Sequence, residues 1–77
     1  MKKVIEIKGM SCNHCKAKVE KALGNIPDVE EAKVNLAKNN AVVNCKSEVE
    51  DKVFRDAISD VGFEVVSIKE KKGLFGG

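Results

Sequence analysis

The sequence predicts an α+β fold, the ferredoxin-like βαββαβ sandwich, in which a four-stranded antiparallel sheet carries two helices on one face. Three observations predict it. Apolar residues alternate with a period of two in four segments, two segments between them carry apolar residues at helical spacing, and glycine or proline stands near most of the boundaries. In a chain of this order, right-handed crossovers place both helices on the same face of a single sheet.

The first strand and the first helix are expected over residues 3–8 and 13–23. The strand alternates apolar with charged residues until Gly9 ends it. Gly24 and Pro27 end the helix in the order usual for a helix terminus. The apolar stripe of this helix consists of Cys15, Val19, Ala22 and Leu23, followed by Ile26.

The next two strands form a predicted hairpin. Alternation resumes over residues 29–36 and again over residues 41–45. The connection Lys38–Asn40 contains residues that tolerate a positive φ, as hairpin turns require.

A second helix and a fourth strand complete the pattern. Ser47 and Glu50 have capping-box spacing, which predicts the helix start, and Gly62 closes the helix. The last strand is expected over residues 63–69. The apolar stripe of this helix consists of Val53, Phe54, Ala57, Ile58 and Val61.

The chain is expected to form one small domain over residues 1–69. Residues 70–77 are polar and glycine-rich, and we expect them to be a flexible C-terminal tail or a docking segment that acts through Leu74 and Phe75. A length of 77 residues excludes a multidomain architecture.

Composition excludes several functions. A balance of 14 Lys+Arg against 12 Asp+Glu, net +2, is too small for the many phosphate contacts of nucleic-acid binding, and three scattered Phe residues offer no stacking platform. No apolar stretch is long enough for membrane insertion, and no signal peptide is present, so a cytoplasmic location is expected. Three cysteines without an export signal point to metal or redox thiols rather than a disulfide framework.

The segment Gly9–Cys15 carries the chemistry. Cys12 lies in the loop and Cys15 in the first helical turn, so both thiols can converge on one ion. The positive end of the helix dipole and the nearby Lys16 favour the thiolate over the thiol. Structural zinc usually recruits four ligands, whereas this motif supplies two thiolates and His14, which fits a soft ion such as Cu(I), with Hg(II) also able to bind.

The motif Gly-Met-Ser-Cys-Asn-His-Cys over residues 9–15, the element order and the pair Gly62–Phe63 resemble the heavy-metal-associated domain family, most closely its small bacterial copper chaperones. The resemblance covers about residues 2–69. It implies that Cys12 and Cys15 bind Cu(I), one ion per monomer or one bridging a homodimer, and that Met10 packs beneath the loop. It also implies delivery of Cu(I) to a similar domain of a copper-transporting P-type ATPase, through intermediates that share three thiolates.

One residue departs from the pattern of the free-standing chaperones of this family. Many of them carry Tyr where this chain has Phe63, and Phe is more frequent in the domains fused to the ATPases. Phe63 can shield the site but cannot donate a hydroxyl hydrogen bond. The start at Met1 and the end soon after the fourth strand favour a free-standing chaperone.

Other residues near the motif are candidates for support or docking. Ser11, His14, Lys16 and Phe63 would support the loop, and His14 would tune the thiolates or, as an alternative, bind the metal directly. The lysines of the first helix, Lys16, Lys18 and Lys21, are either a solvated face or a docking surface for an acidic partner. Cys45 is expected in the core as a small hydrophobic residue, and a third thiolate is the alternative.

Two other functions stay open at this stage. A Zn(II), Cd(II) or Hg(II) transporter or detoxification system could use the same domain, although relatives that handle zinc or cadmium tend to add a carboxylate that this motif lacks. A thiol–disulfide redox protein is the other alternative. No nucleophile, base and orienting group occur together beyond the cysteines and His14, so we expect no enzyme.

Overall fold

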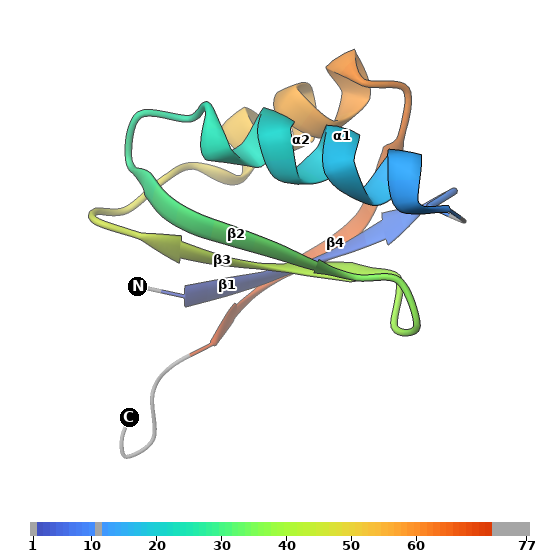
Figure 1. Cartoon of the computed structure of the whole chain (residues 1–77). Helices are drawn as coiled ribbons and strands as arrows, with labels where there is room; N and C mark the ends of the chain where they lie inside the picture. Colours follow the sequence, from blue (N-terminus) through green and yellow to red (C-terminus); the bar gives the residue numbers. More distant parts are fainter. Residues whose placement is uncertain (1, 11, 72–77) are drawn as a thin grey trace.

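The computed structural model describes residues 2–10 and 12–71 and confirms the predicted fold class (Figure 1). Both helices cover one face of the sheet, and no described helix covers the other face. The elements are β1 (Lys2–Lys8), α1 (Asn13–Gly24), β2 (Val29–Asn35), β3 (Asn40–Cys45), α2 (Asp51–Asp60) and β4 (Glu64–Lys71).

The sheet has the order β2-β3-β1-β4, and all its strand pairs are antiparallel. The central strand β1 pairs with β3 and β4, and its last residue, Lys8, leads directly into the loop that contains Cys12 and ends at α1. A β-bulge shifts the register of β1 against β4 between Glu6 and Ile7. The loop therefore begins at the end of a strand that is paired on both sides, close to the β-bulge.

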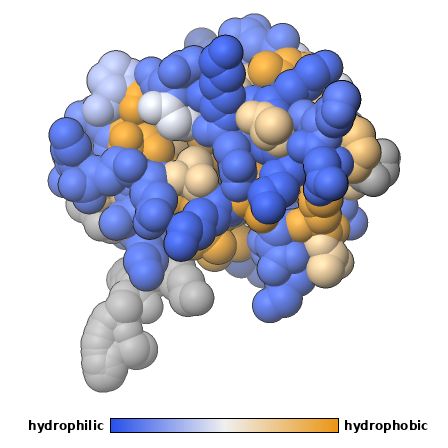
Figure 2. All heavy atoms as spheres, viewed as in Figure 1, coloured by the Kyte–Doolittle hydropathy of each residue, from blue (hydrophilic) through white to orange (hydrophobic). Residues whose placement is uncertain are grey.

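The core lies between the sheet and the two helices. The inward residues of β1 include Ile5 and Ile7, which are almost completely buried as predicted. Val19 and Leu23 of α1 and Phe54 and Ile58 of α2 are the buried residues on the helical side. Figure 2 shows that the surface on the side seen in Figure 1 is mostly hydrophilic, with apolar atoms in small separate patches.

Among the residues that the structure describes, one buried residue is charged. Lys3 is 6% exposed on the core side of β1 and donates a 2.8 Å hydrogen bond from Nζ to the Val49 carbonyl oxygen. The same Nζ lies 3.3 Å from Asp51 Oδ1 and 5.6 Å from the centroid of the Phe54 ring. These partners replace the water that a buried ammonium loses.

The predicted start of the second helix is wrong. Helix α2 begins at Asp51 with Glu50 as its N-cap residue, and no side chain caps it, so Ser47 and Glu50 form no capping box. The chain stays non-helical up to Glu50 because Val49 is 5% exposed and belongs to the core, while its carbonyl accepts the bond from Lys3. Tertiary packing has therefore overridden a local sequence signal.

The last strand also differs from its predicted bounds. It begins at Glu64 and continues to Lys71, because Glu70 and Lys71 pair with the first residues of β1. The expected boundary after residue 69 thus falls inside β4. The flexible or docking segment expected around Leu74 and Phe75 lies outside the described residues. Within the described ranges, neither helix combines the length and apolar character needed to cross a membrane.

Candidate metal centre

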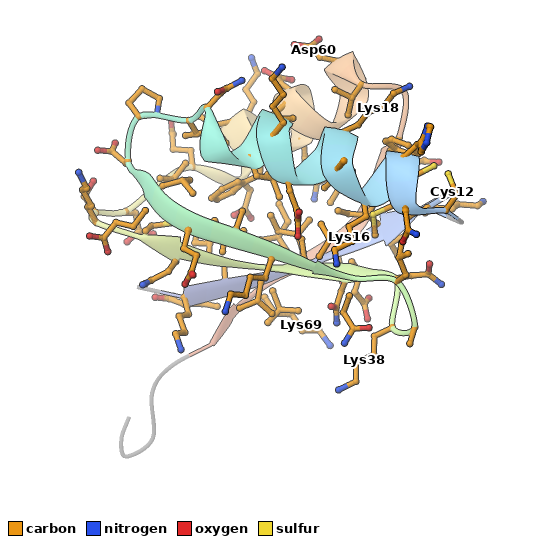
Figure 3. The ribbon with its side chains drawn as sticks, in the orientation of Figure 1. Cys12, Lys16, Lys18, Lys38, Asp60 and Lys69 are labelled. Atoms are coloured by element: carbon orange, nitrogen blue, oxygen red, sulfur yellow. The ribbon has the colours of Figure 1, made fainter. Side chains whose placement is uncertain are left out.

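Two thiols lie side by side at the start of α1. Cys12 Sγ and Cys15 Sγ are 3.1 Å apart, and Cys12 is exposed to solvent (Figure 3). Two thiols this close together can bind the same soft ion. The exposure of Cys12 leaves that ion open to a further ligand.

The local backbone explains this placement. Cys12 is the N-cap residue of α1, with φ −150° and ψ 169°, and its carbonyl accepts the Lys16 N–H at 3.1 Å. Its side chain makes no capping hydrogen bond, so the backbone does not occupy the thiol. The first N–H groups of the helix and its dipole favour negative charge at this place, which suits thiolates.

The loop is supported from below by apolar packing. Met10 is 4% exposed and belongs to the hydrophobic core, and the half-buried Cys15 packs against that core. The two cysteines therefore differ: Cys15 is set into the fold, whereas Cys12 lies at its surface. A thioether that is buried in this way serves packing rather than an exposed ion.

Gly9 and Phe63 bring two distant parts of the chain together at the loop. Gly9 has φ +98°, which L-residues with side chains rarely adopt, and a Cβ there would lie 3.6 Å from Phe63 Cδ1. Phe63 lies three residues after the end of α2, and its N–H donates to the Ile58 carbonyl at 3.2 Å. The aromatic ring expected near the site is thus held beside the loop by the end of α2.

The remaining candidates of the loop and first helix do not gather into one cluster. His14 is exposed, and Ser11 lies outside the described residues. Figure 3 shows Lys16 on the side of α1 that faces the sheet, whereas Lys18 is on the far side.

The lysines of α1 form no single patch. Lys18 and Lys21 line a groove of about 420 Å³ between α1 and α2, together with Asp60. Lys16 is half-buried and does not line this groove. Of the predicted docking residues, the structure therefore brings two together and separates the third.

Within residues 2–10 and 12–71, no three side chains of His, Cys, Asp or Glu are grouped so that they could hold one metal ion. Cys45, the alternative third thiolate, belongs to the core at 2% exposure. It ends β3 near Lys2, at the far end of β1 from the loop. At about 3.3 Å per residue, β1 separates it from the loop by about 20 Å, so the third-thiolate alternative is wrong.

Sequence analysis missed Asn39 as a residue that supports this end of the molecule. Its carbonyl accepts the Ile7 N–H at 2.9 Å, and its own φ is +53°. This bond ties the β2–β3 hairpin to the end of β1, just before the loop. The turn composition indicated the hairpin, but no local signal could indicate its contact with β1.

Known proteins are similar to this chain over a region that includes the two cysteines. The heavy-metal-associated domain matches residues 4–64, which include the loop, both helices and the start of β4. The chain belongs to the heavy-metal-associated domain family. This membership confirms the resemblance drawn from the motif over residues 9–15.

Particular members of the family are similar over most of their length. The copper chaperone CopZ of Enterococcus hirae is 42% identical over 65 residues, which cover 83% of this chain and 94% of that protein. A solved structure of a CopZ metallochaperone superposes with a TM-score of 0.80 at 42% identity, covering 86% of this chain and all of the other. A copper-binding domain of a P-type ATPase gives a TM-score of 0.77 at 32% identity, covering 91% of this chain and all of that domain.

Proposed function

We propose that this protein is a cytoplasmic copper chaperone. It carries Cu(I) on Cys12 and Cys15 and passes the ion by thiolate exchange to a heavy-metal-associated domain of a copper-transporting P-type ATPase. The observation that carries the proposal is the pair of sulfur atoms of the exposed Cys12 and the half-buried Cys15, 3.1 Å apart at a helix N-terminus. Relatives named copper chaperones, at 42–44% identity, support the choice of metal.

The chemistry of the pair favours Cu(I) over harder ions. Thiolates are soft ligands, and a site with only two of them suits an ion of low coordination number. With metal–sulfur bonds of about 2.3 Å, a linear arrangement needs the sulfurs about 4.6 Å apart. The exposed Cys12 can supply this movement, because its side chain is not tied to the backbone.

The unequal burial of the two cysteines supports transfer rather than storage. A thiolate of the receiving domain can approach the ion from the Cys12 side and form a three-thiolate intermediate. Cys12 is then the first ligand to be released, while the half-buried Cys15 holds the ion until the second exchange. In this scheme the protein is a carrier and not an enzyme.

Two of the three lysines expected to dock a partner, Lys18 and Lys21, are the docking residues in this proposed function. Lys18 and Lys21 lie together on the groove between the helices, and carboxylates of the receiving domain would speed its encounter with them. Lys16 and His14 would instead influence the charge around the loop. A copper-bridged dimer of this chain is a further state of the same exposed site.

A competition titration tests the metal ligands. The anaerobic protein is titrated with Cu(I) against a chromogenic Cu(I) chelator, for the wild type and for Cys12→Ser, Cys15→Ser and Cys45→Ser. We expect one ion per monomer or per dimer. We also expect affinity losses of at least about 100-fold for each of the first two variants, since even outer partners of a metal site contribute 10–100-fold.

Cys45→Ser is the matched control, because it removes a thiol about 20 Å from the loop. Unchanged affinity in Cys12→Ser would contradict the site, and preferential binding of Zn(II) in direct competition would contradict the metal. Failure of the loaded protein to pass copper to the soluble domain of such an ATPase would contradict the chaperone role. Insulin-reducing activity would favour the redox alternative.

A further inference from the structure

An open groove on the uncovered side of the sheet has no role in the proposed function. It has a volume of about 290 Å³ and lies where the end of β1, the β2–β3 hairpin and β4 meet. Its lining includes Lys8, Lys38, Glu6 and Val66. It also includes the backbone of Gly9, so the groove reaches the first residue of the metal loop.

Val66 is the apolar element of this groove. Its exposed fraction is 59%, the largest among the large hydrophobic residues that the structure describes. In the register of β1 with β4, Ser67 pairs with Glu6 and Val65 with Ile7, so Val66 is the extra residue of the bulge. A bulge redirects a side chain, and here it places a valine in solvent rather than in the core.

The charge of the groove is unbalanced in favour of lysine. Neither Lys8 nor Lys38 has an ion-pair partner among the described side chains. The carboxylate of Glu6 accepts a 2.7 Å hydrogen bond from the Ser67 hydroxyl, which holds it at β4. Among the residues that line the groove, two ammonium groups therefore accompany one carboxylate that is already hydrogen-bonded.

The walls are fixed before any partner arrives. The Ile7 N–H bond to the Asn39 carbonyl holds the hairpin against β1, and the Lys38 N–H donates to Asn35 Oδ1 at 3.2 Å. Figure 3 shows Lys38 on the hairpin, on the side of the sheet away from the helices. Little conformational entropy is lost when a ligand enters a groove that is already formed.

We propose that this groove is a docking site for an acidic protein segment that carries an aliphatic side chain between carboxylates. The aliphatic side chain covers Val66, and the flanking carboxylates pair with Lys8 and Lys38. The site lies on the opposite side of the sheet from the groove between the helices. A protein bound here leaves Lys18 and Lys21 accessible to a different partner.

The test uses the metal-free protein, so its outcome does not depend on the copper proposal. The probe is a synthetic peptide, acetyl-Asp-Glu-Leu-Asp-Glu-amide, added at low ionic strength to ¹⁵N-labelled protein. We expect amide shifts at residues 6–9, 38–39 and 66. The variants Lys8→Gln/Lys38→Gln and Val66→Thr should each weaken binding by about threefold or more, as rim ion pairs and one apolar contact allow.

Lys46→Gln/Lys52→Gln is the matched control, since it removes the same charge at exposed positions outside the groove. It should bind the peptide as the wild type does, and the basic peptide acetyl-Lys-Arg-Leu-Arg-Lys-amide should not bind. Amide shifts centred on the lysines of α1, or equal weakening by the control variant, would overturn the proposal. So would affinity that is unchanged in both groove variants, whose spectra also report whether each variant is folded.

Discussion

The three cysteines lie in different surroundings, and the difference sets what each thiol can do. Cys12 is exposed and Cys15 half-buried, whereas Cys45 is 2% exposed in the core. Burial raises the pKa of the Cys45 thiol, and the nearby Lys3 ammonium opposes this shift without outweighing it. Cys45 therefore stays protonated in the fold at a pH where an exposed thiol would ionise.

The raised pKa predicts a loss of stability at alkaline pH. Well below about pH 8.5, the ordinary pKa of cysteine, the Cys45 thiol is protonated in both states and contributes no pH dependence. Above that pH the unfolded chain releases the proton while the fold keeps it. The free energy of unfolding then falls, by up to about 1.4 kcal/mol per pH unit, until the raised pKa of the fold is reached.

Urea unfolding of the reduced protein between about pH 7 and pH 10 measures this loss. Because lysines also titrate in that range, the slope is compared with that of Cys45→Ala, which we expect to be flatter. Parallel slopes for the wild type and Cys45→Ala would contradict the assignment.

At the scale of elements, Lys3 connects β1 with the start of α2. Its stem runs through the core, and its Nζ reaches the Val49 carbonyl at 2.8 Å and Asp51 at 3.3 Å. The helix has no side-chain cap of its own. We infer that this lysine fixes where α2 begins.

Lys3→Met should destabilise the protein by about 1–3 kcal/mol, because it keeps the length of the side chain but leaves the Val49 carbonyl without its donor. Asp51→Asn should cost less than about 1 kcal/mol, since the side chain of Asp51 is 53% exposed. Urea unfolding measures both. An Asp51→Asn effect as large as that of Lys3→Met would mean that the ion pair, not the bond to Val49, holds the helix start.

The elements also show which features a sequence can predict. Alternation, helical spacing and glycine positions predicted all six elements, because these signals are local. The predicted start of α2 is wrong because the observed start depends on the hydrogen bond from Lys3 to Val49, two residues that are 46 positions apart in the sequence. The exposure of Val66 could not be predicted from the sequence either, since the bulge that exposes it arises only when β1 pairs with β4.

The candidate site likewise has features that the sequence predicts and features that depend on contacts between distant segments. Cys12 and Cys15 are three residues apart at the start of a helix, so their proximity follows from local geometry. The closeness of Phe63 to Gly9 joins distant segments, and only the resemblance to a family indicated that Phe63 lies near the site. The separation of Lys16 from Lys18 could have been predicted, since two helical steps turn a side chain through about 200°.

At the scale of the whole molecule, the loop, the start of α1 and the end of α2 meet at one end of a body of 33 × 25 × 18 Å. A single domain of this size normally unfolds in one cooperative step. In the proposed function the ion bridges Cys12 and Cys15, and the fold already holds the two sulfurs 3.1 Å apart, so we expect it to bind the folded state more tightly than the unfolded chain. Binding at one end should therefore stabilise the entire molecule, including β1 and the distant Cys45 region.

Cu(I) should thus raise the melting temperature of the protein. At free Cu(I) about 100 times the dissociation constant, linkage gives about 2.7 kcal/mol. For a domain of 60–100 residues, each kcal/mol corresponds to about 4–8 °C, so the expected rise is about 10–20 °C. Anaerobic thermal unfolding followed by circular dichroism, with buffered Cu(I), measures it. Cys45→Ala should show the full rise above its own metal-free value, and Cys12→Ser should show little. A full rise in Cys12→Ser, or its loss in Cys45→Ala, would place the stabilising ion elsewhere than on the loop.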